Sequence, residues 1–174
     1  MLDNTKGQLI NFDEALMRYS RTEIHVNRNG SFKHCLSVQF LIEFCKTRDM
    51  LLFDSDTILN HSVDFIDPLV VTAADIEEKN EKSCRNGVVY RSETRFIPFI
   101  QYFNCSMMKN LGLKYFDRNR ILGGMTSAGN HYDTGASFYE DVAKMKLPFK
   151  KIPYRQYIDH LEHGSWRKRC MQTA

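Results

Sequence analysis

The sequence has no long apolar run, no C-x-x-C pair and no large excess of charge. No stretch approaches the roughly 18 consecutive apolar residues that cross a bilayer, and the first residues, MLDNTKGQ, lack the apolar core of a signal peptide. The five cysteines are odd in number and scattered along the chain, which favours reduced thiols over a disulfide framework. These absences predict a soluble, cytoplasmic protein whose association with a membrane would be peripheral at most.

The charge balance argues against a dedicated nucleic-acid binder. The net charge is only +3, whereas such proteins carry dense basic stripes. Basic residues do occur between positions 91 and 120, but Asp117 lies among them, which disfavours nucleic-acid binding as the main role. The 174 residues, 43% of them hydrophobic, suit one domain with its own core. We therefore predict a single domain over 1–174, in which 153–174 form a basic segment containing histidine and tryptophan.

The pattern of apolar residues predicts alternating helices and strands. The predicted helices cover 11–19, 31–46, 106–111 and 138–145. The predicted strands cover 23–26, 50–53, 69–74, 87–90 and 96–103, and the charged stretch 77–82 is predicted to be a solvated loop. The order strand, helix, strand between residues 23 and 53 indicates a crossover unit, which joins parallel strands. We expect an α/β fold with a mainly parallel mixed sheet flanked by helices, a Rossmann-like architecture.

Two aspartates, Asp54 and Asp56, follow the most strand-like run of the chain in the stretch LLFDSDT. Ligands of parallel α/β sheets gather at the carboxyl ends of strands, and alternation along an extended chain would place both carboxylates on one side. Two like charges this close are tolerated beside a cation, and hard oxygen ligands suit Mg²⁺ or Mn²⁺. The alternative interpretation is structural: Asp54 caps the following turn and Asp56 is solvated.

Three further stretches accompany the aspartate pair: MLDNTKG at 1–7, FNCSMMKNL at 103–111 and HLEHGSW at 160–166. Together with LLFDSDT they resemble motifs of nucleotide-sugar-dependent glycosyltransferases of the A-type fold, whose D-x-D element binds a divalent ion that holds the donor diphosphate. The first stretch is similar to the inverting branch and the second to the retaining branch, with Ser106 standing where glycine is usual. Such enzymes begin with a strand ahead of the first stretch, and we expect this chain to lack it.

The resemblance implies an activity and a set of site residues. It implies transfer of a sugar from a nucleotide-diphosphate sugar, most commonly UDP-linked, to an acceptor hydroxyl, with Mn²⁺ or Mg²⁺ as cofactor. The implied metal ligands are Asp54, Asp56 and His163, and the implied donor contacts are Asp54, Asn104 and Trp166.

Two histidines and two carboxylates each suit either a site role or exposed surface. His160, three residues before His163, is interpreted as exposed surface of the basic segment. An inverting enzyme needs a general base to deprotonate the acceptor hydroxyl. We assign Asp133, beside a glycine in a loop, as an acceptor contact and Asp141, on the predicted helix 138–145, as the base. A retaining enzyme would need no such base, so both stereochemical outcomes stay open.

Two other functions compete with the glycosyltransferase interpretation. A D-x-D pair after an apolar strand also begins the haloacid dehalogenase-like phosphotransferases, in which the first aspartate is the nucleophile. Their pattern continues with glycine, whereas Thr57 and Ile58 follow here, and a late aspartate pair is missing. The second competitor is a non-catalytic transferase-like binding module, which would lose nothing if Asp54 and Asp56 became asparagine.

Overall fold

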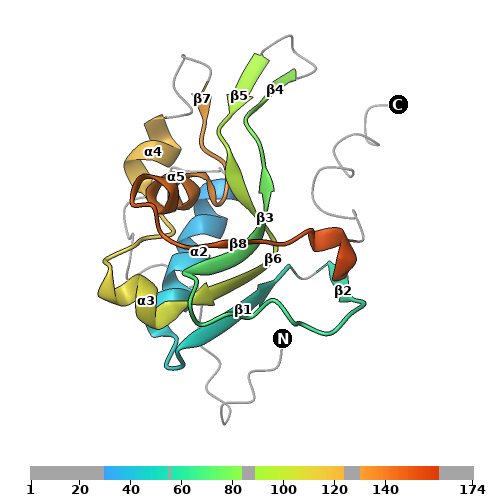
Figure 1. Cartoon of the computed structure of the whole chain (residues 1–174). Helices are drawn as coiled ribbons and strands as arrows, with labels where there is room; N and C mark the ends of the chain where they lie inside the picture. Colours follow the sequence, from blue (N-terminus) through green and yellow to red (C-terminus); the bar gives the residue numbers. More distant parts are fainter. Residues whose placement is uncertain (1–29, 55, 84–88, 124–129, 161–174) are drawn as a thin grey trace.

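The structure is a computed structural model that describes residues 30–54, 56–83, 89–123 and 130–160 (Figure 1). The α-helices in these ranges are α2 (Gly30–Phe44), α3 (Cys105–Asn110), α4 (Arg118–Gly123) and α5 (Ala136–Lys144). The strands are β1 (Asp49–Phe53), β2 (Thr57–Leu59), β3 (Thr72–Glu77), β4 (Asn80–Ser83), β5 (Val89–Ser92), β6 (Arg95–Asn104), β7 (Asn130–His131), β8 (Lys150–Lys151) and β9 (Ile158–His160). A short 3-10 helix, η1 (Tyr154–Gln156), precedes β9. Within the described ranges, none of the helices is both long and apolar enough to cross a membrane.

The central sheet has the strand order β1-β6-β3-β8, with the long strand β6 in its interior (Figure 1). β6 pairs antiparallel with both β1 and β3, whereas β8 runs parallel to β3. The prediction of a mainly parallel sheet is therefore wrong for the described strands. That prediction depended on a crossover from the expected strand 23–26, which lies outside the described residues, and β1 pairs instead with β6. The coarser prediction of an α/β chain with a mixed sheet is confirmed.

Alternation along β1 gives its side chains to two different apolar clusters. Met50 and Leu52 pack into the cluster formed with the helices α2, α3 and α5. Leu51 and Phe53 pack into the cluster on the other side of the sheet, which includes residues of the 63–70 segment, η1 and β9. Asp54 continues the phase of Met50 and Leu52, so its side chain leaves the strand toward the helical side, where α2 lies.

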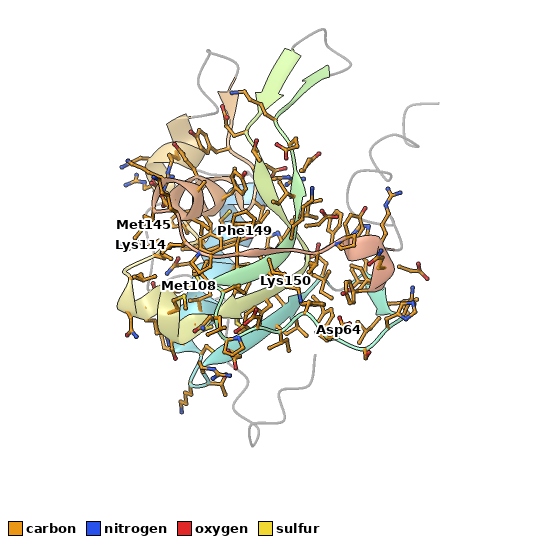
Figure 2. The ribbon with its side chains drawn as sticks, in the orientation of Figure 1. Asp64, Met108, Lys114, Met145, Phe149 and Lys150 are labelled. Atoms are coloured by element: carbon orange, nitrogen blue, oxygen red, sulfur yellow. The ribbon has the colours of Figure 1, made fainter. Side chains whose placement is uncertain are left out.

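Aromatic rings fill the space between α5 and the sheet. Phe149, labelled in Figure 2, lies just before β8, and its ring centroid is 5.5 Å from that of Phe96 and 6.3 Å from that of Tyr139. Phe138 and Tyr115 complete this packing, with centroids 5.4 Å apart. The same packing fixes the start of α5 against β6, close in the chain to Asp133, the predicted acceptor contact.

Most predicted elements near the candidate site are confirmed with small shifts of their ends. The helices predicted at 31–46, 106–111 and 138–145 correspond to α2, α3 and α5, and the strands predicted at 50–53 and 96–103 correspond to β1 and β6. The strand predicted at 69–74 begins only at Thr72, because Asp67 forms a turn in which it accepts hydrogen bonds from the backbone N–H groups of Leu69 and Val70. The helix at 11–19 lies outside the described residues, and the strand predicted at 87–90 overlaps β5 at its last two positions.

The charged stretch 77–82 is not the loop that its composition predicted. β3 continues to Glu77, and after two residues β4 begins and pairs antiparallel with β5. Two ion pairs hold this region: Arg95 Nε of β6 lies 2.6 Å from a Glu77 oxygen of β3, and Lys79 Nζ, before β4, lies 3.1 Å from Glu93, after β5. These two ion pairs favour strand pairing of a polar segment here.

Candidate metal centre

The chain turns sharply at the aspartate pair. Asp54 donates its backbone N–H to the carbonyl oxygen of Phe99 at 3.1 Å, which ends the pairing of β1 with β6. The carbonyl of Asp54 then accepts two bonds from Thr57, one from the backbone nitrogen at 3.2 Å and one from the hydroxyl at 2.7 Å. The expectation of an extended chain is therefore wrong: a hydrogen-bonded turn follows Asp54, and β2 begins directly after it. The two carboxylates nevertheless lie close together, as expected.

Pairing of β2 with β9 brings a histidine to the turn from far along the sequence. The register places Thr57 opposite His160. As a result, His160 Nε2 lies 3.3 Å from Asp56 Oδ1, and ligand atoms of Asp54, Asp56 and His160 all lie within 4.8 Å of one another. We call these three residues the Asp54–Asp56–His160 cluster. The side chain of His160 is only 17% exposed, so its interpretation as exposed surface is wrong.

The ring of His160 is held by an aromatic neighbour. It stacks on the ring of Phe99, with centroids 4.0 Å apart and planes 23° from parallel. Phe99 is also the residue whose carbonyl fixes Asp54, so one residue of β6 supports two members of the cluster. A stacked ring can still direct a nitrogen at a ligand in its plane, and this supports the geometry that a metal-binding imidazole needs.

The surroundings of Asp54 have opposing effects on the pKa of its carboxyl group. Burial raises the pKa of the Asp54 carboxyl, the neighbouring charge of Asp56 raises it further, and His34 and His160 act in the opposite direction. His34 belongs to α2, and its Nε2 lies 3.9 Å from Asp54 Oδ1. Two carboxylates in this position are costly without a cation nearby, and a bound divalent ion would remove that cost.

The donor atoms of the cluster suit a small divalent cation. Two carboxylates and one imidazole can supply three ligands, and the partial exposure of all three side chains leaves the remaining positions open to solvent and substrate oxygens. Carboxylates alone suit Mg²⁺, and the added nitrogen favours Mn²⁺ or another transition metal. The residues therefore fit the predicted cofactor, with His160 in the place that the sequence analysis gave to His163.

Asn104, a predicted donor contact, has a structural role instead. It is 3% exposed, and its side-chain oxygen caps α3 by accepting a hydrogen bond from the backbone nitrogen of Met107 at 2.9 Å. Its amide nitrogen donates to the carbonyl of Pro68 at 3.0 Å. Because both ends of the amide are engaged inside the fold, the donor contact of Asn104 stays a prediction without geometric support. Trp166, another predicted donor contact, and His163, a predicted metal ligand, fall outside the described residues.

The predicted acceptor contact and base are held in ion pairs, and neither belongs to the Asp54–Asp56–His160 cluster. Asp133 accepts a hydrogen bond from Arg95 at 2.6 Å, and Arg95 also bonds Glu77. Both carboxylate oxygens of Asp141 accept from Arg120, at 2.9 and 2.6 Å. A carboxylate whose two oxygens already accept hydrogen bonds from a guanidinium is poorly prepared to take a proton, so the role of Asp141 as a base stays a prediction without geometric support.

A hollow of about 420 Å³ lies beside α5 and is separate from the cluster. Its lining includes Glu140, whose carboxylate bonds the hydroxyl of Tyr132 at 3.2 Å. None of the three cluster residues belongs to its lining, which is formed by Glu93, Thr94, Tyr132, Ala136, Tyr139, Glu140, Ala143 and Lys144.

Sequence reasoning missed two of the four ionisable groups at the turn, and each left a signal. For His160 the signal is the apolar Ile158 two residues earlier. Side chains two apart on a strand share a face, and Ile158 is buried, so His160 lies on the inward face as well. His34 stands four residues before the buried Val38, on the apolar side of α2.

Among protein-family models, curated proteins and solved structures, none matches this chain, so conclusions about function depend on the chemistry of the cluster itself.

Proposed function

We propose that the protein is a metal-dependent glycosyltransferase that moves a sugar from a nucleotide-diphosphate sugar, UDP-linked, to an acceptor hydroxyl. The proposal includes an A-type fold and a cytoplasmic location. The observation that carries it is the Asp54–Asp56–His160 cluster, in which the D-x-D aspartates gain an imidazole through the pairing of β2 with β9. Two sequence-distant segments thus converge on the motif that the resemblance singled out.

The chemistry of glycosyl transfer explains why this cluster is useful. The bond between the anomeric carbon and the β-phosphate oxygen breaks, a bond from that carbon to the acceptor oxygen forms, and the acceptor proton passes to a base or to solvent. A bound Mn²⁺ or Mg²⁺ would offset the negative charge that collects on the departing diphosphate. The protein's part is to fix the carboxylates of Asp54 and Asp56 through the turn and to hold the His160 ring on Phe99.

The experiment that tests the proposal is a thermal shift measurement with UDP and Mn²⁺, added separately and together. Stabilisation is expected with both ligands, because a ligand that binds the folded state raises its stability in proportion to the logarithm of its concentration over Kd. The variants Asp54→Asn and Asp56→Asn should remove the shift. Asp159→Asn is the matched control, because Asp159 lies on the same strand as His160 but is exposed and outside the cluster.

The outcomes separate the proposed function from its competitors. A shift in wild type and Asp159→Asn, lost in both cluster variants, supports a metal-diphosphate site and justifies a transfer assay with a series of nucleotide sugars. The absence of a shift with UDP and with the other nucleoside diphosphates would overturn the proposal in favour of a non-catalytic binding module. A response to Mg²⁺ with inorganic phosphate alone would instead direct attention to phosphotransferase chemistry at Asp54.

A further inference from the structure

His34, on α2, lies next to Asp54. Its Nε2 is 3.9 Å from Asp54 Oδ1, and its side chain is 34% exposed. His34 is not part of the group of ligand atoms that lie within 4.8 Å of one another, which consists of Asp54, Asp56 and His160. The carboxylate of Asp54 therefore belongs to the cluster and also has His34 as a neighbour from α2.

The backbones that carry His34 and Asp54 are both fixed. α2 is anchored by Cys35, Leu36 and Val38, each at most 2% exposed. Asp54 is anchored by its hydrogen bonds with Phe99 and Thr57. The gap of 3.9 Å is about 1 Å longer than a usual N–H···O bond, a difference that small rotations of two side chains can close without moving either backbone.

We infer that His34 is a positioning residue for the metal site: its Nε2–H donates a hydrogen bond to Oδ1 of Asp54 and leaves Oδ2 directed at the cation. This inference rests on the proposed function, since it concerns the same metal. Carboxylates that bind metals are commonly fixed by a hydrogen bond from a neighbouring residue, and loss of such a partner typically weakens metal binding about 10- to 100-fold. A neutral imidazole is sufficient, because the bond needs only the proton on Nε2.

The experiment measures the Kd for Mn²⁺ from the electron paramagnetic resonance signal of the free ion, using the full chain. His34→Ala should raise the Kd about 10-fold. His34→Gln should restore binding to within about 3-fold of wild type, because the amide nitrogen of glutamine reaches the position of Nε2. His34→Asn should not restore it, because the shorter amide ends near the position of Nδ1. His61→Ala is the control, because His61 is exposed and outside the cluster.

The outcomes distinguish failure of the inference about His34 from failure of the proposed function. Equal Kd values for wild type and His34→Ala would overturn the inference while leaving the metal site intact. Equal Kd values for His34→Gln and His34→Asn would also overturn it, and this comparison holds even if the alanine variant is poorly folded. Absence of Mn²⁺ binding by wild type would overturn the proposed function as well. Thermal unfolding of each variant without metal separates lost positioning from lost stability, since positioning changes the Kd and leaves the unfolding temperature unaltered.

Discussion

Replacement of Gly135 by alanine is expected to destabilise the protein more than the same substitution at Gly112. Gly135 has a φ of +85° and precedes α5, where it forms the N-cap position. A Cβ built there would overlap the carbonyl oxygen of Phe96 and lie 3.3 Å from both the carbonyl carbon of Phe96 and the hydroxyl of Tyr115. The obstacle is backbone inside the sheet, so no rotamer change can relieve it.

The expected loss of folding stability in Gly135→Ala has two contributions. An alanine with positive φ costs about 1–2 kcal/mol, and forced overpacking against a fixed neighbour costs about 1–3 kcal/mol more. Gly112 provides the matched control, since its φ is +65° but a Cβ there meets nothing within 4 Å. Gly112→Ala should therefore lose about 1–2 kcal/mol at most, part of which is offset by the reduced entropy of the unfolded chain.

Urea denaturation of the two variants and wild type gives the free energies of unfolding directly. We expect Gly135→Ala to be less stable than Gly112→Ala by about 1–3 kcal/mol. Equal losses in the two variants would refute the close approach of α5 to β6. The result also matters for the candidate site, because Gly135 follows the loop that places Asp133 beside Arg95.

Two other substitutions test the charges near the candidate site. Because burial raises the pKa of Asp54, its contribution to folding is favourable at low pH and is lost as the pH rises through that pKa. Asp54→Asn without metal should therefore be at least as stable as wild type at pH 7 and less dependent on pH between 3 and 7 in thermal unfolding. Arg120→Met should lower stability by about 1–3 kcal/mol in urea, since Arg120 joins α4 to α5 through Asp117, Glu140 and Asp141 and these partly exposed pairs are partly screened. Arg120→Lys should recover only part of the loss, as lysine cannot bond both oxygens of Asp141, and full recovery would contradict this explanation.

The elements around the turn could be predicted from local sequence because local physics decides them. The apolar face of α2, the four apolar residues that end at Phe53 and the long apolar run of β6 each bury their side chains in any compact arrangement. The position of Asp54 and Asp56 at a strand end follows from the same pattern. Metal binding at this pair stays a prediction from two like charges that close together, and the structure places His160 beside them as a third candidate ligand.

Strand direction and the identity of the histidine depended on long-range pairing, which local patterns do not encode. β1 pairs with β6, and β2 pairs with β9, across large separations in the chain. The register of the second pair places His160 opposite Thr57, whereas spacing within HLEHGSW offered no reason to prefer it over His163. Asn104 illustrates the converse, since a residue chosen from a motif turned out to be a helix cap tied to Pro68.

The most direct test of the metal centre compares two histidine variants in Mn²⁺ binding with UDP present. The structure places His160 within the cluster, 3.3 Å from Asp56, and the sequence resemblance implied His163. We predict that His160→Ala raises the Kd for Mn²⁺ by more than about 10-fold, because it removes a ligand rather than an outer partner, and that His163→Ala leaves it nearly unchanged. Unchanged binding in His160→Ala, or a larger loss in His163→Ala, would contradict the Asp54–Asp56–His160 cluster as the metal site.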